Sequence, residues 1–169
     1  ARDQALAIVD VGTGTGAILL ALLAHLPRAT GLGTDISAGA VQTAATNAYR
    51  LGLDGRALFA VCDTAAAVRG PVDLMVSNPP YIPSADIAGL DREVREHDPR
   101  AALDGGADGL DFYRALAAAA PKLVAPDGAV IVEFGIGQAE SVAEIFRLAH
   151  FARRNVLPDL EGRPRVLCA

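Results

Sequence analysis

The feature that most constrains the fold is a glycine-rich turn between an apolar strand and an apolar helix. The sequence Ala-Ile-Val-Asp-Val at residues 7–11 predicts a buried strand, and residues 17–26 follow a helical pattern. Between them lies the turn Gly12-Thr13-Gly14-Thr15-Gly16. Glycine adopts backbone conformations that other residues avoid and lets the chain approach a ligand closely. A strand, a glycine turn and a helix in this order begin a βαβ unit, which predicts helices packed on a parallel sheet.

The same turn predicts a nucleoside cofactor, because free N–H groups at the start of the helix lie beside any bound ligand. Two spacings fit. Gly12, Gly14 and Ala17 match the dinucleotide pattern G-x-G-x-x-G/A, whereas Asp10 with Gly12, Gly14 and Gly16 matches the D-x-G-x-G-x-G form of methyltransferases. The turn alone leaves both interpretations open.

Two further strands end in acidic residues. Residues 30–35 end at Asp35, 19 residues after Gly16, where a carboxylate can accept hydrogen bonds from both ribose hydroxyls. The alternative is that Asp35 only caps the next helix, predicted from near Ser37 to Gly52. Residues 57–62 predict a third strand, followed by Asp63 and Thr64. These two residues could contact the edge of an adenine, or they could form an ordinary turn at the end of the strand.

The motif Asn78-Pro79-Pro80-Tyr81 closes an apolar strand predicted over residues 72–77. Proline fixes its own φ and pushes the preceding residue into the extended region, so this segment is stiff. The Asn78 side-chain oxygen and the Pro79 carbonyl can converge on one NH2 group while the Tyr81 ring lies flat against the planar group that carries it. A planar amino or amide substrate is therefore predicted; a simple proline turn would leave the asparagine and the tyrosine unexplained.

The remaining pattern predicts one α/β domain over residues 1–169, with about seven strands alternating with helices. A strand over 129–132 leads to Glu133, which could shape the site or only support it. Strands over 151–156 and 163–168 predict a closing antiparallel hairpin. Residues 82–110 have little periodicity beyond a short helix over 87–96, and a long loop after a site motif predicts a lid or a substrate wall.

The chain resembles the HemK/PrmC family of protein-glutamine methyltransferases over nearly its whole length. The resemblance rests on residues 10–17, 77–83 and 98–110, on Glu133-Phe134-Gly135 and on residues 159–165. It implies a Rossmann-like class I S-adenosylmethionine-dependent methyltransferase fold, with a mostly parallel seven-stranded sheet and a C-terminal antiparallel hairpin.

The resemblance also implies site roles. The cofactor S-adenosylmethionine would be bound by Asp10, Gly12, Thr13, Gly14, Thr15, Gly16, Asp35, Asp63, Thr64 and Asn78. The glutamine amide of the substrate would be bound by Asn78, Pro79, Pro80 and Tyr81. The expected catalytic residues are Asn78, Pro79 and Tyr81. Family members often carry a bulky apolar residue where Thr64 stands, so weaker adenine stacking is expected here.

The expected protein partner is a translation release factor, methylated in the cytoplasm on the glutamine of its Gly-Gly-Gln motif; a minority branch of the family modifies a ribosomal protein. Family members carry an amino-terminal helical domain that helps to recognise the release factor. The first predicted strand begins a few residues after Ala1, so the chain is expected to be the catalytic domain without that domain.

Charge and composition disfavour other classes. A net charge of −5 without a Lys/Arg block disfavours nucleic-acid partners, no apolar run has membrane length, and the three histidines have no metal-ligand spacing, so no metal is expected. Two alternatives remain: an amino-methyltransferase for DNA or RNA, which would need a basic groove, and a non-catalytic nucleotide-binding module, which would prefer NAD or tolerate changes in Asn78 to Tyr81.

Overall fold

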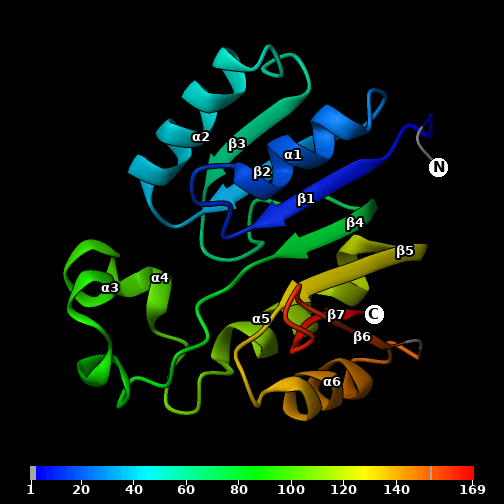
Figure 1. Ribbon diagram of the computed structural model, residues 1–169. Coiled ribbons are helices and arrows are strands. Elements are labelled where there is room, and N and C mark those ends of the chain that lie inside the picture. The colour runs from blue at the N-terminus through cyan, green and yellow to red at the C-terminus, as the bar shows by residue number, and fades with distance from the viewer. Residues whose placement is uncertain (1–2, 153) are drawn as a thin grey trace. The chain divides into compact units, whose positions relative to one another are not determined.

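A computed structural model describes residues 3–152 and 154–169 and orders the strands β3-β2-β1-β4-β5-β7-β6 in one seven-stranded sheet (Figure 1). The strands are β1 (Ala7–Val11), β2 (Thr30–Asp35), β3 (Ala57–Val61), β4 (Val72–Ser77), β5 (Val124–Glu133), β6 (Asn155–Pro158) and β7 (Pro164–Cys168). The helices are α1 (Ala17–His25), α2 (Ala38–Arg50), the 3₁₀ turn η1 (Ile87–Gly89), α3 (Arg92–His97), α4 (Arg100–Leu103), α5 (Asp111–Leu123) and α6 (Ala139–Leu148). The predicted α/β class with seven strands is confirmed.

The chain divides into two compact units. The first unit comprises Ala1–Asn78 and Ala119–Ile131, and the second comprises Pro79–Ala118 and Val132–Ala169. In the first unit β1 pairs in parallel with β2 and β4, and β2 pairs in parallel with β3. Val11 lies opposite Thr34, Asp35 opposite Val61 and Asp10 opposite Val76. The carboxyl ends of these four strands therefore share one edge of the sheet, which is where open α/β sheets bind ligands.

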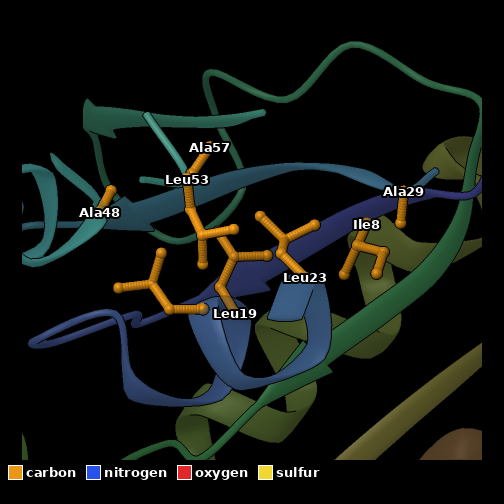
Figure 2. Packing of buried hydrophobic residues seen from close by; sticks show 8 residues of the cluster. Ile8, Leu19, Leu23, Ala29, Ala48, Leu53 and Ala57 are labelled. Carbon is orange, nitrogen blue, oxygen red and sulfur yellow. The ribbon is translucent and has the colours of Figure 1, made fainter. Parts of the chain in front are cut away.

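The core of the first unit is the packing of α1 on β1 and β2. Leu19 and Leu23 of α1 are fully buried and point toward Leu53 and Ile8 (Figure 2). A Cβ at Gly31 of β2 would lie 2.4 Å from a Leu19 methyl carbon, so only glycine permits this close approach. Each buried leucine contributes about 1.5–3 kcal/mol relative to exposure. This packing fixes the helix that starts at the glycine turn.

The glycine turn and the start of α2 follow from local chemistry. Gly12, Gly14 and Gly16 all have positive φ, which a side chain would strain. The Ser37 side chain caps α2 by accepting a hydrogen bond from the Ala40 N–H at 3.3 Å, and Gly52 follows the helix with φ of 67°. The predicted helix from near Ser37 to Gly52 is confirmed.

The second unit contains the closing hairpin, but one predicted strand was wrong in its bounds. β6 and β7 pair antiparallel, with Val156 opposite Leu167. β6 begins at Asn155 rather than 151, because the Phe151 ring packs edge-on against the Phe146 ring of α6, with centroids 5.8 Å apart. Residue 153 lies outside the described residues. Phe151 therefore packs against the end of α6 instead of starting a strand.

Two other bounds differ from expectation. β5 begins at Val124, not 129, and passes through Gly128, where a Cβ would lie 2.9 Å from the Asp73 carbonyl oxygen. The single helix predicted over 87–96 is divided into η1 and α3, because Leu90 between them is extended. Between β3 and β4 the described chain has turns and no helix, so the predicted alternation of strands with helices is interrupted there.

Candidate functional site

The glycine turn is held by the carboxyl end of β2. The backbone N–H groups of Gly12 and Thr13 both donate to the Thr34 carbonyl oxygen at 2.8 Å, and the Gly14 N–H donates to the Asp35 carboxylate at 2.9 Å. The predicted glycine turn and the predicted ribose-binding acid are thus brought together within the first unit.

Asp10 lies in the buried part of β1 and has one carboxylate oxygen without a hydrogen-bond partner among the described residues. Its side chain is 1 % exposed, and Oδ2 accepts a hydrogen bond from the Thr13 hydroxyl at 2.7 Å. Oδ1 is buried and has no partner among the described residues. Burial raises the pKa of Asp10 to about 6, although the Thr13 hydrogen bond works against this rise. A buried carboxylate oxygen without a donor is costly, so this position favours a ligand with a cationic donor.

Asp35 already organises the backbone on both sides of it. Oδ2 accepts from Gly14 N–H and Oδ1 accepts from Ser37 N–H, each at 2.9 Å. The N-cap residue of α2 is Ser37, so capping alone does not account for Asp35. A carboxylate offers about four acceptor positions, which leaves room for two further donors.

The end of β3 carries Asp63, which is exposed, and Thr64, which is half-buried. The Thr64 carbonyl oxygen accepts from the Thr34 hydroxyl at 2.9 Å, and Thr64 has φ of 48°, a left-handed conformation that is unusual for a β-branched residue. Strained residues of this kind concentrate at functional sites.

Sequence reasoning missed Ile36, which stands between Asp35 and Ser37. Its side chain is 66 % exposed. A large apolar residue directly after the acid at a strand end was the available signal, because such a side chain can offer an apolar surface to a ring.

Asn78 follows the last residue of β4 at the same sheet edge. The Ser77 hydroxyl donates to the Val11 carbonyl oxygen at 2.6 Å, which joins the end of β4 to the end of β1. Asn78 is exposed, and within residues 3–152 and 154–169 its side-chain amide makes no hydrogen bond. Its amide is free to bind a ligand.

The rest of the Asn78 to Tyr81 motif lies in the second unit, where Pro79 is buried and Pro80 and Tyr81 are half-buried. One Arg165 nitrogen donates to the Tyr81 hydroxyl at 3.2 Å and to Glu133 Oε1 at 2.9 Å. The Gln138 side-chain N–H donates to the Tyr81 carbonyl oxygen at 2.9 Å. Sequence reasoning assigned no role to Arg165 or Gln138. Arg165 had a signal, since it ends the motif at residues 159–165; Gln138 had none.

The segment after Tyr81 is ordered by backbone pairing rather than by periodic packing. Ile82 pairs with the chain near Asp104: Ile82 N–H donates to the Leu103 carbonyl at 3.0 Å, and Gly105 N–H donates to the Ile82 carbonyl at 2.8 Å. Hydrogen bonds from the Ser84 hydroxyl and the Gly106 N–H hold the pKa of Asp104 below its usual value. Hydrogen bonds around Ile82 and Asp104, rather than an apolar helical face, order this part of the segment, so helical periodicity did not predict it.

The first-unit residues fit the cofactor that the sequence resemblance implied. Asp10 Oδ1 needs a donor, Asp35 has acceptor positions left, and a Cβ at Gly14 would meet no described atom within 4 Å. Among residues 3–152 and 154–169, no group of three or more His, Cys, Asp or Glu side chains could hold a metal ion. Nor does this described part contain a helix long and apolar enough to cross a membrane.

Comparisons with known proteins agree with this geometry. The sequence model of the methyltransferase small domain family matches residues 2–90. A protein of Rhodospirillum rubrum named release factor glutamine methyltransferase is 60 % identical over 162 residues, which are 96 % of this chain and 50 % of that protein. The chain spans about half the length of the curated relatives it matches. The resemblance predicted from the sequence is confirmed.

Two solved structures share the fold. A ribosomal protein L11 methylase of Lactobacillus delbrueckii subsp. bulgaricus superposes with a TM-score of 0.71 at 21 % identity, covering 98 % of this chain and 69 % of that one. An RNA methyltransferase of Salinibacter ruber in complex with S-adenosyl-L-homocysteine superposes with a TM-score of 0.62 at 18 % identity, covering 99 % and 81 %. The class I methyltransferase fold is confirmed, and the chain belongs to the methyltransferase small domain family.

Proposed function

We propose that this chain is the catalytic domain of an S-adenosylmethionine-dependent protein-glutamine N-methyltransferase that acts on the Gly-Gly-Gln glutamine of peptide chain release factors. The observation that carries the proposal is the free, exposed amide of Asn78 at the strand end next to the glycine turn. The relative named release factor glutamine methyltransferase supports the substrate assignment. A substrate that acts in translation would be methylated in the cytoplasm.

The cofactor would be bound by residues of the first unit. Asp10 Oδ1 would accept a hydrogen bond from the amino group of its methionine part, the turn from Gly12 to Gly16 would line that part, and Asp35 would accept from the ribose hydroxyls. Asp63 and Thr64 would flank the adenine, with the exposed Ile36 side chain offering an apolar wall. When bound, S-adenosylmethionine supplies a methyl group already activated on a sulfonium.

The chain's own residues would then align and activate the acceptor. An amide nitrogen is a poor nucleophile because its lone pair is delocalised into the carbonyl, the effect behind a rotation barrier of about 18–20 kcal/mol. Asn78 Oδ1 and the Pro79 carbonyl oxygen would accept hydrogen bonds from the two N–H bonds of the glutamine amide. These acceptors hold the nitrogen in place and stabilise positive charge that develops on it, while Tyr81 lies against the amide plane. The extra proton can then leave to water.

Replacing Asn78 tests this amide clamp. In the complete gene product, Asn78→Ala should slow methyl transfer by about 100-fold or more, by analogy with removing one preorganised transition-state partner. Affinity for S-adenosylmethionine should change much less. Single-turnover kinetics at saturating cofactor measure the rate, and calorimetry measures the affinity.

A matched control is Asn155→Ala, which removes an exposed asparagine in β6. This variant should transfer methyl groups at the parental rate. If Asn78→Ala also kept the parental rate, the proposed amide clamp would be wrong.

A further inference from the structure

The Tyr81 hydroxyl is held by Arg165, a residue without a role in the methyl transfer proposed above. The Arg165 guanidinium carbon lies 5.4 Å from the centre of the Tyr81 ring, within the range of cation–π contacts, and an Arg165 nitrogen donates to the ring hydroxyl at 3.2 Å. These are two separate attractions between the same two side chains. Together they select one orientation of the ring.

Arg165 is itself held in place. Its side chain is 21 % exposed and the Glu133 side chain is 33 % exposed, so the 2.9 Å pair between them is partly shielded from water. Arg165 belongs to β7, and its carbonyl oxygen accepts from the Phe134 N–H at 2.9 Å, directly after Glu133. Backbone and side chain therefore anchor the guanidinium on the strands, rather than on a loop.

The backbone of Tyr81 is fixed independently by Gln138. The Gln138 amide donates to the carbonyl oxygens of Tyr81 and Gly109 at 2.9 and 3.3 Å and accepts from the Gly135 N–H at 2.9 Å. A Cβ at Gly135 would lie 2.9 Å from Tyr81 Cδ2, and one at Gly109 would lie 2.4 Å from the Tyr81 carbonyl oxygen. The main chain and one ring edge are thus tightly packed. Arg165 contacts the hydroxyl and the face of the same ring.

We propose that Arg165, anchored by Glu133, is a positioning residue that sets the orientation of the Tyr81 ring against the planar amide of the methyl acceptor. This inference rests on the proposed function and deepens it. An arginine suits the task because its planar guanidinium can lie over an aromatic ring and donate several hydrogen bonds at fixed angles. A ring turned away would leave the acceptor amide able to rotate, so the rate of transfer would fall while cofactor binding would not.

The test combines kinetics and spectroscopy on Arg165→Gln. In the complete gene product, kcat for release factor methylation should fall by about tenfold, within the range that small misplacements cost. Affinity for S-adenosylmethionine should stay within about twofold, and Glu133→Gln should produce a smaller effect in the same direction. Arg163→Gln is the matched control, because Arg163 lies two residues earlier and pairs with the exposed Glu161; it should leave kcat unchanged.

Tyrosine NMR reports the ring directly. The chain has three tyrosines, so ring-labelled tyrosine gives three sets of signals. The Tyr81 signals should shift in Arg165→Gln, while those of exposed Tyr49 should not. Unchanged Tyr81 signals would overturn the positioning role of Arg165, whether or not methyl transfer is found. If the parent methylated no glutamine, only the proposed function would be contradicted.

A double-mutant cycle separates positioning from direct substrate contact. If Arg165 acts through the Tyr81 hydroxyl, Arg165→Gln should slow kcat much less in a Tyr81→Phe background than in the parent. If the two effects multiply independently, Arg165 acts on the substrate by itself and the positioning role is wrong.

Discussion

Asp10 combines a structural cost with the cofactor-binding role that we propose for it. Burial of a carboxylate with one oxygen lacking a donor in the described residues raises its pKa to about 6, so the folded protein retains this proton more strongly than the unfolded chain does. The folded-state pKa is raised above the ordinary 3.8, so the contribution to stability is complete at low pH and is lost as the pH rises from about 4 through 6. A ligand that pairs with the Asp10 carboxylate would offset this cost.

The first prediction concerns this titration. Between pH 4 and pH 8 the parent should lose up to about 3 kcal/mol of unfolding free energy relative to Asp10→Asn, from about 1.4 kcal/mol per pKa unit. Conversely, the parent should bind S-adenosylmethionine more tightly above pH 6, because the ligand ammonium needs the ionised carboxylate. Urea unfolding and calorimetry across this pH range measure both. A cofactor affinity that is independent of pH between 5 and 8 would contradict the assignment of Asp10.

At the scale of elements, the glycine turn between β1 and α1 shows which parts of the site follow from sequence. Its glycines were predicted to permit a close ligand approach, and Gly14 has φ of 54° with open space where a Cβ would point. What the sequence did not predict is how the turn is held, by hydrogen bonds to the Thr34 carbonyl and the Asp35 carboxylate. Those contacts depend on strand register, which the sequence pattern leaves open.

A pair of glycines makes the ligand role of this turn testable. Gly14 and Gly52 both have positive φ, and a Cβ at either would meet no described atom within 4 Å. Alanine should therefore cost about 1 to 2 kcal/mol of stability at each position through backbone strain alone. Only Gly14→Ala should also reduce cofactor affinity, by about tenfold or more, equivalent to about 1.4 kcal/mol.

Thermal unfolding and calorimetry on the two variants separate strain from steric exclusion. If Gly14→Ala and Gly52→Ala lost cofactor affinity equally, the turn would not line the cofactor.

Contacts that the sequence pattern does not show also explain which element bounds were predicted wrongly. Strands that are mostly apolar, such as β1 and β4, were predicted with their observed bounds. β6 was not, because Phe151 packs on Phe146 of α6, and strand periodicity does not predict a contact with a helix. Arg165 and Gln138 were missed because their partners, Tyr81 among them, are 84 and 57 residues away in the chain.

At the scale of the whole molecule, the chain carries a complete set of predicted site residues but about half the length of its curated relatives. Stable protein interfaces bury about 1,200–2,000 Å² in total, more than a catalytic cleft alone is expected to provide. We therefore expect this chain to bind cofactor yet to methylate release factor with a lower kcat/KM than the complete gene product. Steady-state kinetics on release factor compare the two. Equal values would place substrate recognition within this chain, with residues 82–110 as the first segment to examine.

The most direct measurement is to locate the transferred methyl group. The complete gene product is incubated with isotopically labelled S-adenosylmethionine and a release factor, and the digested release factor is sequenced by mass spectrometry. We expect one labelled methyl group on the side-chain amide nitrogen of the Gly-Gly-Gln glutamine, and none when that glutamine is replaced by asparagine or when the enzyme carries Asn78→Ala. Label on a different residue, or on RNA or DNA supplied in the same reaction, with the glutamine unmodified, would contradict protein-glutamine methylation.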